Sequence, residues 1–123
     1  MKRLIPVIVF FGLTACGPDV EVDLTIGQAM APVAVTVTDN EYTPAEIEVT
    51  AGQSVTFTNI GGNAHDIVAA DPDANENFGV NIDNFKNDQP YTYEFDRPGE
   101  YSFYCSIHGT KKGSGMAGTI IVK

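Results

Sequence analysis

The sequence has little of several residue types that common function classes require. It contains no tryptophan, two histidines, two cysteines, and seven basic side chains against 16 acidic ones. The formal charge of −9 argues against a nucleic-acid partner, because phosphates attract lysine and arginine rather than carboxylates. The two histidines also exclude any site that needs three imidazoles.

The length and the hydrophobic composition of the chain are those of one small folded domain. The chain has 123 residues and a hydrophobic fraction of 43%, which is ordinary for a globular protein and excludes wholesale disorder. Its 12 aromatic residues, seven Phe and five Tyr, are enough to fill one core. A chain of this length has room for a single domain.

The first residues have the pattern of an export signal. Lys2 and Arg3 precede an apolar run over residues 4–13, which is too short to cross a bilayer and is typical of a secretory signal peptide. The residues Leu-Thr-Ala-Cys that end at Cys16 resemble the lipobox of bacterial lipoproteins. An ordinary signal peptide with an incidental cysteine, or an apolar strand, is the alternative.

This pattern predicts three parts of the chain. We expect a signal peptide over residues 1–15, a lipidated Cys16 with a flexible tether over 16–31, and a folded domain over 32–123. The exported protein would be anchored by its lipid to the outer face of a membrane, in the periplasm or at the cell surface. An acidic domain is repelled by anionic lipids, so the lipid would be its only contact with the membrane.

Alternation of apolar and polar residues predicts strands in most of the domain. In one example, Val55 and Phe57 alternate with Ser54, Thr56 and Thr58. Turn residues such as Gly61-Gly62 and Arg97-Pro98-Gly99 separate the alternating segments. Several short strands with one apolar face each predict an all-β, antiparallel sandwich of two sheets. The predicted strands cover residues 33–38, 46–50, 54–58, 93–96, 101–105 and 116–123.

One polar segment, residues 71–90, lacks this alternation. Its acidic and amide side chains are spaced much as in a calcium-binding loop, but Glu76 stands where glycine is needed and Ile82 where a bidentate Glu is needed. We therefore predict an acidic, solvated loop rather than a calcium site, with a short helix near residues 78–85.

Four residues with soft or borderline ligand atoms predict a metal site. Cys105, His108 and Met116 lie within twelve residues, and His65 follows a Gly-Gly-Asn turn. A lipidated Cys16 would leave Cys105 without a disulfide partner, and metal ligation explains a free thiol in an exported protein. Two His, one Cys and a weak Met are the ligand set of blue-copper electron-transfer sites.

Other interpretations of these residues are weaker. Structural zinc would prefer further Cys or His to a Met, and the chain has none to offer. Taken singly, His65 could be a surface histidine, Cys105 an inert buried thiol and Met116 a core residue. Their joint occurrence uses every histidine in the chain, which favours the copper site.

The residues from about 33 to 123 resemble the cupredoxins, in particular the plastocyanin, amicyanin and halocyanin group of type 1 copper proteins. The similar segments are Asn-Ala-His-Asp-Ile-Val around His65, Gly-Glu-Tyr-Ser-Phe-Tyr-Cys-Ser-Ile-His ending at His108, and Gly-Met-Ala-Gly-Thr-Ile-Ile-Val around Met116. The resemblance implies a Greek-key β-sandwich and one copper ion bound by His65, Cys105, His108 and Met116.

The resemblance also implies a function. The family consists of one-electron carriers, so we expect a monomeric electron-transfer protein rather than an enzyme, with cytochromes or copper oxidoreductases, some of them basic, as partners. Electrons would pass through His108 within an apolar surface that includes Ile107 and Ala64, or through Tyr104. Copper binding and delivery without electron transfer is the alternative. Copper enzymes with several sites need more histidines than the chain has.

Three features depart from the plastocyanin pattern. Seven residues separate His108 from Met116, where plastocyanins have four, and they include Lys111 and Lys112; we expect a longer, more flexible and locally positive loop. Ile107 replaces a proline. Asp66 replaces an asparagine, and its carboxylate is expected to stabilise Cu(II) and to lower the reduction potential.

Overall fold

The computed structural model describes residues 30–74 and 77–123. The predicted signal peptide over 1–15, Cys16 and most of the tether over 16–31 lie outside the described residues. Within them, every regular element is a β-strand, and no helix is long and apolar enough to cross a membrane. The strands are β1 (Val33–Thr38), β2 (Glu41–Thr43), β3 (Glu46–Val49), β4 (Gln53–Asn59), β5 (Ile67–Ala69), β6 (Gly79–Val80), β7 (Tyr91–Phe95), β8 (Gly99–Gly109) and β9 (Gly115–Val122).

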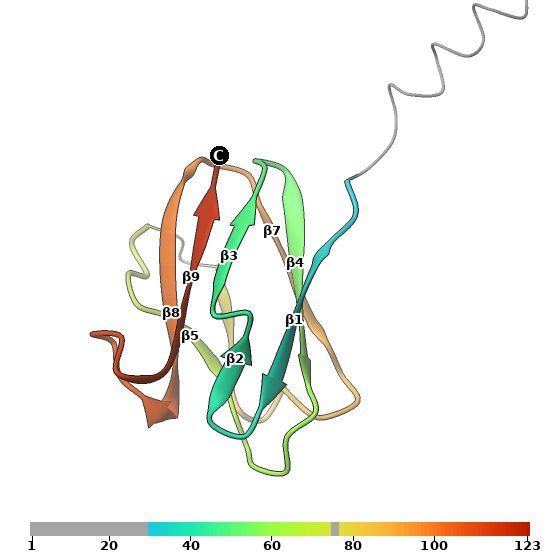
Figure 1. Cartoon of the computed structure of the whole chain (residues 1–123), viewed down its shortest axis with the longest axis vertical. Helices are drawn as coiled ribbons and strands as arrows, with labels where there is room; N and C mark the ends of the chain where they lie inside the picture. The colour runs from blue at the N-terminus through green and yellow to red at the C-terminus, as the bar shows by residue number, and fades with distance from the viewer. Residues whose placement is uncertain (1–29, 75–76) are drawn as a thin grey trace, which may run out of the picture.

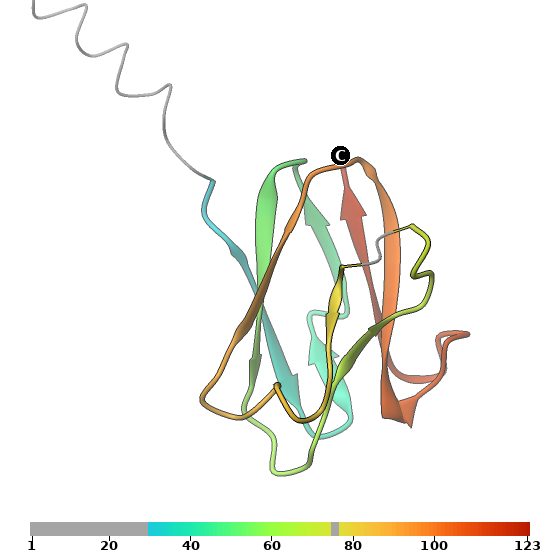
Figure 2. The same ribbon diagram turned by 180° about the vertical axis from the view of Figure 1, so that it is seen from behind.

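These strands form two facing sheets (Figure 1; Figure 2 shows the opposite side). One sheet has the order β2-β1-β4-β7 and the other the order β3-β9-β8-β5-β6. The predicted all-β sandwich is therefore confirmed. The expectation that all pairs are antiparallel is wrong, because β1 pairs with β4 and β3 with β9 in parallel. The chain changes sheets between β2 and β3, so strands distant in the sequence become neighbours and can run in the same direction.

The predicted alternation of side chains forms the core between the sheets. In β4, Val55 and Phe57 are fully buried while the threonines beside them are partly exposed. The ring of Phe57 packs edge-on against Phe103 from the other sheet, with 5.4 Å between the ring centroids. Aromatic pairs of this kind add about 1 kcal/mol beyond the area that they bury, so Phe57 and Phe103 hold the two sheets together.

The polar segment of residues 71–90 differs from the prediction. In its described part the expected helix is absent, and Gly79–Val80 form the short edge strand β6. Phe78 and Phe85 are 5% and 2% exposed, so the segment is not a fully solvated loop. Phe78 packs against Phe95 and Phe103 with ring centroids 5.0 and 5.9 Å apart. Two buried aromatic residues fix this acidic segment to the core, which sequence alternation could not indicate.

Candidate metal centre

The four predicted ligands come from separate parts of the chain near one end of the sandwich. His65 lies in the connection between β4 and β5, Cys105 and His108 belong to the last residues of β8, and Met116 is the second residue of β9. This end, the lower one in Figure 1, also carries the turn between β1 and β2.

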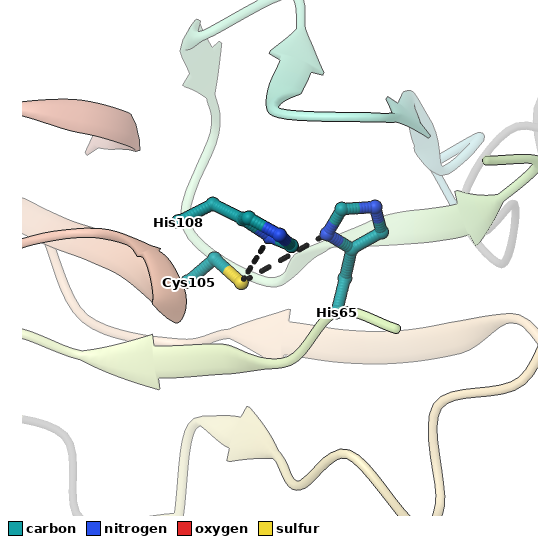
Figure 3. Close-up of side chains that lie close together, drawn as sticks. All are labelled: His65, Cys105 and His108. Atoms are coloured by element: carbon teal, nitrogen blue, oxygen red, sulfur yellow. Dashed lines mark hydrogen bonds between the residues drawn. The ribbon is translucent and has the colours of Figure 1, made fainter. Parts of the chain in front are cut away.

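Three of these side chains point toward one another (Figure 3). The Sγ atom of Cys105 lies 3.9 Å from Nδ1 of His65 and 3.7 Å from Nδ1 of His108. The ligand atoms of the three residues all lie within 4.8 Å of one another. The structure therefore brings together residues that are separated by about forty positions in the sequence.

An irregularity in β8 allows the side chains of Cys105 and His108 to point toward the same site. Residues three apart in a regular strand point to opposite faces of a sheet. The pairing of β8 with β9 is regular up to Tyr104 opposite Ala117, shifts in register, and resumes at Gly109 opposite Gly115. Such bulges re-aim side chains and are common beside functional sites. The shift therefore turns the His108 imidazole back toward the Cys105 thiol.

The candidate ligands differ in their access to solvent. His65 and Cys105 are completely buried, Met116 is 1% exposed, and His108 is only half-buried. Cys105 forms no disulfide in the described part of the chain. Metal held at this centre would be shielded from water on most sides, with the His108 ring as the ligand nearest to the surface.

The loop between His108 and Met116 is closed by hydrogen bonds. Thr110 N–H donates to the Ser114 carbonyl at 2.9 Å, and Gly113 N–H donates to the Thr110 carbonyl at 2.9 Å. The side chains of Lys111 and Lys112 are exposed on this turn. The hydrogen bonds of Thr110 and Gly113, together with the pairing of Gly109 with Gly115, make this loop the tip of the β8–β9 hairpin.

Asp66 connects the two segments that carry the ligands. Its carboxylate accepts hydrogen bonds from the Ser106 backbone N–H at 2.7 Å and from the Ser106 hydroxyl at 2.5 Å. The Asp66 carbonyl accepts a hydrogen bond from the buried Tyr42 hydroxyl at 2.7 Å. Because Asp66 follows His65 and Ser106 follows Cys105, these bonds hold the two buried ligand atoms at a fixed separation.

A second carboxylate lies on the other side of the His65 ring. Asp39 Oδ1 is 3.4 Å from His65 Nε2 and accepts a hydrogen bond from the Asn63 backbone N–H at 2.9 Å. The Asn63 N–H is the main cause of a lowered Asp39 pKa, with smaller contributions from His65 and the Gly62 N–H. Asp39 is therefore anionic at neutral pH.

The surface beside the centre contains the predicted electron-transfer residues. Ile107 is 50% exposed, and Ala64 is exposed on the loop that carries His65. Tyr104 is half-buried and sits opposite Val68 of β5 on the outer face of its sheet. Ile60, at 61% exposure, is a further large apolar residue at the surface, directly after β4.

Sequence reasoning did not identify Asp39, Ser106 or Ile60. The two polar residues act through hydrogen bonds to residues 24 to 40 positions away, and no local pattern encodes such contacts. Ile60 carried a weak signal, because it is an isolated apolar residue between an asparagine and two glycines, where a turn is expected to be polar.

Comparison with protein families identifies the group to which this fold and site belong. The family described as copper binding proteins, plastocyanin/azurin family, matches residues 30–123. The chain belongs to this family. Copper is accordingly the metal of the chain, and the cluster of His65, Cys105 and His108 lies inside the matched region.

Plastocyanins are among the relatives of the chain. A chloroplastic plastocyanin of Tetradesmus obliquus is 40% identical over 89 residues, which cover 67% of this chain and 58% of the relative. The chloroplastic plastocyanin of Chlamydomonas reinhardtii is 36% identical over 90 residues, or 68% of this chain and 59% of the relative. The chain thus spans less than two thirds of the length of these two relatives.

Solved structures give the same fold. A purple cupredoxin from Nitrosopumilus maritimus has a TM-score of 0.59 at 22% identity, covering 74% of this chain and 99% of its own. A reduced amicyanin variant has a TM-score of 0.62 at 22% identity, and the match covers 80% of this chain and 88% of the amicyanin chain. A copper-containing nitrite reductase from Thermus scotoductus matches with a TM-score of 0.61 at 26% identity, over 80% of this chain but 26% of the enzyme.

The donor atoms fit a copper ion. A metal bound to one thiolate and one imidazole at ordinary bond lengths, with an angle near 120°, separates the two ligand atoms by about 3.8 Å. The observed separations of 3.9 and 3.7 Å match this value. Thiolate and thioether suit Cu(I), and imidazole suits both oxidation states. These ligand atoms therefore agree in chemistry and in spacing with the metal of the family.

Proposed function

We propose that the chain is a one-electron carrier with a single type 1 copper site. His65, Cys105 and His108 would bind the ion and Met116 would be its weak axial ligand. Bound copper supplies the Cu(II)/Cu(I) couple. The observation that carries the proposal is the convergence of two imidazole nitrogens and one thiol sulfur from two ligand segments, in a cluster where His65 and Cys105 are buried and His108 is half-buried.

The protein supplies rigidity and a path to the surface. Asp66 and Ser106 fix the two ligand segments against each other, so the site changes little when one electron is gained or lost. The half-buried His108 lies next to the exposed Ile107. We propose that a redox partner, such as a cytochrome or a copper oxidoreductase, docks on this surface, and that the Tyr104 face offers a second path.

Burial of the ligands favours electron transfer over copper delivery. A delivery protein exchanges its ion with a partner and needs accessible ligand atoms, whereas His65, Cys105 and Met116 are at most 1% exposed. An enzymatic role is also disfavoured, because the two histidines of the chain are already used by one site.

The visible spectrum of the purified protein tests this proposal. Loaded with Cu(II), it should show an intense thiolate-to-copper band that bleaches with ascorbate and returns on reoxidation. Cys105→Ser should abolish the band, because the charge-transfer donor is the thiolate sulfur and serine has no sulfur, while Cys16→Ser should keep it. Absence of a thiolate band in the wild-type protein would refute the electron-transfer function. A band that is lost together with copper on addition of a copper-free acceptor protein would favour delivery.

We further propose that the protein acts as a monomer outside the cytoplasm, anchored to a membrane by a lipid on Cys16. The support is the charged, then apolar leader that ends in Leu-Thr-Ala-Cys. Mass spectrometry of the protein purified from its native membrane should find a lipidated Cys16 as the first residue. An unmodified chain that begins at another position would contradict the anchor.

A further inference from the structure

The imidazole of His65 has a different partner on each side. Its Nδ1 atom faces the Cys105 sulfur at 3.9 Å, and its Nε2 atom faces Asp39 Oδ1 at 3.4 Å. The ring is completely buried, whereas the Asp39 side chain is 45% exposed. A neutral imidazole carries its proton on one nitrogen only, so the partner of Nε2 determines whether Nδ1 is free to bind a metal.

Asp39 is itself held in place by the turn between β1 and β2 and by the loop that carries His65. Its Oδ1 atom accepts the Asn63 N–H at 2.9 Å. Asn40, which follows it, has a φ of 71°, a left-handed conformation that asparagine tolerates well. Gly61 packs so closely that a Cβ atom there would lie 3.0 Å from the Asp39 backbone nitrogen. The carboxylate therefore has little freedom to leave Nε2.

We propose that Asp39 is a positioning residue for the copper site: it keeps the His65 proton on Nε2, leaves Nδ1 free as the ligand atom, and favours Cu(II) over Cu(I) by its negative charge. This inference rests on the function proposed above. Carboxylates that accept the second N–H of a histidine ligand orient the ring and raise its basicity. A more basic imidazole beside an anion stabilises the more highly charged copper ion.

The substitution Asp39→Asn tests the effect of the charge. Asparagine is the same size and its oxygen can still accept the Asn63 N–H, so the turn should fold. The same oxygen faces Nε2, and as a neutral amide oxygen it accepts the Nε2–H more weakly than a carboxylate does. Mutation of such outer partners typically costs 10- to 100-fold in metal affinity. We expect the Cu(II) affinity to fall at least about tenfold relative to the Cu(I) affinity, which raises the one-electron reduction potential by about 59 mV for each factor of ten.

Glu41→Gln is the matched control. Glu41 is an exposed residue at the start of β2, two positions after Asp39, and its substitution removes the same charge without changing the group that faces His65. Its effect on the potential should be small. A shift for Asp39→Asn that is no larger than the shift for Glu41→Gln would overturn the proposal, because Asp39 would then act only as one more surface charge.

A second measurement needs no copper. Imidazole nitrogen chemical shifts in the copper-free wild-type protein show which nitrogen of His65 carries the proton. We expect Nε2–H in the wild type and a greater share of Nδ1–H in Asp39→Asn. A wild-type proton on Nδ1 would overturn the inference. If the loaded wild-type protein showed no thiolate band, the proposed function would fail instead, so the two failures are distinguishable.

Discussion

At the scale of single residues, Asp66 has two roles that one substitution can separate. Its carboxylate accepts both hydrogen bonds from Ser106 and is only 8% exposed. It also places a negative charge beside the ligand cluster. A neutral group of the same shape would keep one acceptor oxygen and lose the charge.

We predict that Asp66→Asn raises the reduction potential, because Cu(II) loses the stabilising charge. Ser106→Ala is the control: it removes one hydrogen bond to a charged group, which costs about 2 kcal/mol of unfolding free energy, but it keeps the charge. Redox titration of both variants measures the reduction potentials, and denaturant unfolding measures the unfolding free energies. An equal potential in the wild type and Asp66→Asn would show that the carboxylate acts only as a connector.

At the scale of elements, the end of the β8–β9 hairpin decides where the ligands meet. Gly109 of β8 pairs with Gly115 of β9 directly beside Met116. A Cβ atom added to Gly109 would lie 2.8 and 2.9 Å from the backbone carbon and nitrogen of Met116. Real Cβ atoms do not approach a backbone so closely, so the two strands would have to separate at this point.

We therefore predict that Gly109→Ala lowers the unfolding free energy by about 1–3 kcal/mol, the usual cost of an inserted methyl group in a packed site, and alters the thiolate band through a displaced Met116. Gly113→Ala is the matched control in the same loop. Gly113 has a φ of 93° but open space around its Cβ position, so it should cost about 1 kcal/mol and leave the spectrum unchanged. Denaturant unfolding and visible spectra measure both effects.

At the scale of the whole molecule, stability at high pH depends on the buried Tyr42 and the half-buried Tyr91. Burial is the main cause of a pKa of Tyr42 well above the ordinary value near 10, with added repulsion from Cys105 and Asp66. Burial also raises the pKa of Tyr91, against the opposing hydrogen bond from the Gly79 N–H. The folded state therefore keeps these protons at a pH where the unfolded chain has lost them.

This linkage predicts a loss of stability above about pH 10. The contribution of each tyrosine is fully present below the pKa of the unfolded chain and is lost by about 1.4 kcal/mol per pH unit above it. Tyr42→Phe should reduce the slope, although it costs about 1 kcal/mol at neutral pH because the Asp66 carbonyl loses its donor. Denaturant unfolding of the copper-free wild type and of Tyr42→Phe between pH 8 and 11 measures the slope of stability against pH and the offset between the two proteins. A slope equal to that of the wild type would contradict the assignment.

The charge distribution of the whole molecule predicts how docking depends on salt. Asp83 and Asp88 are exposed in the segment that reaches the His65 loop, where the Asn87 amide donates to the Gly61 carbonyl at 2.6 Å. Charges at this end attract a basic partner at low ionic strength and are screened as the Debye length falls from about 30 to 8 Å.

We predict that the association rate with a basic cytochrome falls as ionic strength rises. The double substitution Asp83→Asn and Asp88→Asn should flatten this dependence. The control is Glu94→Gln with Glu100→Gln, which removes two charges beside the β7–β8 connection, at the opposite end of β8 from the ligands. Stopped-flow kinetics at several salt concentrations measures the rates. A rate that does not depend on ionic strength would refute docking through acidic residues.

The sequence by itself determined six of the nine strands of the described residues, all but the short β2, β5 and β6, and the identity of the candidate ligands. Alternation sets which side chains of a strand face the core, and the supply of His, Cys and Met limits which metal the chain can hold. Tertiary structure alone decided the parallel pairings, the burial of Phe78 and Phe85, and the register shift that aims His108 at Cys105. It also placed Asp39 against His65, because contacts between residues far apart in the chain depend on how the sheets pack and leave no local pattern.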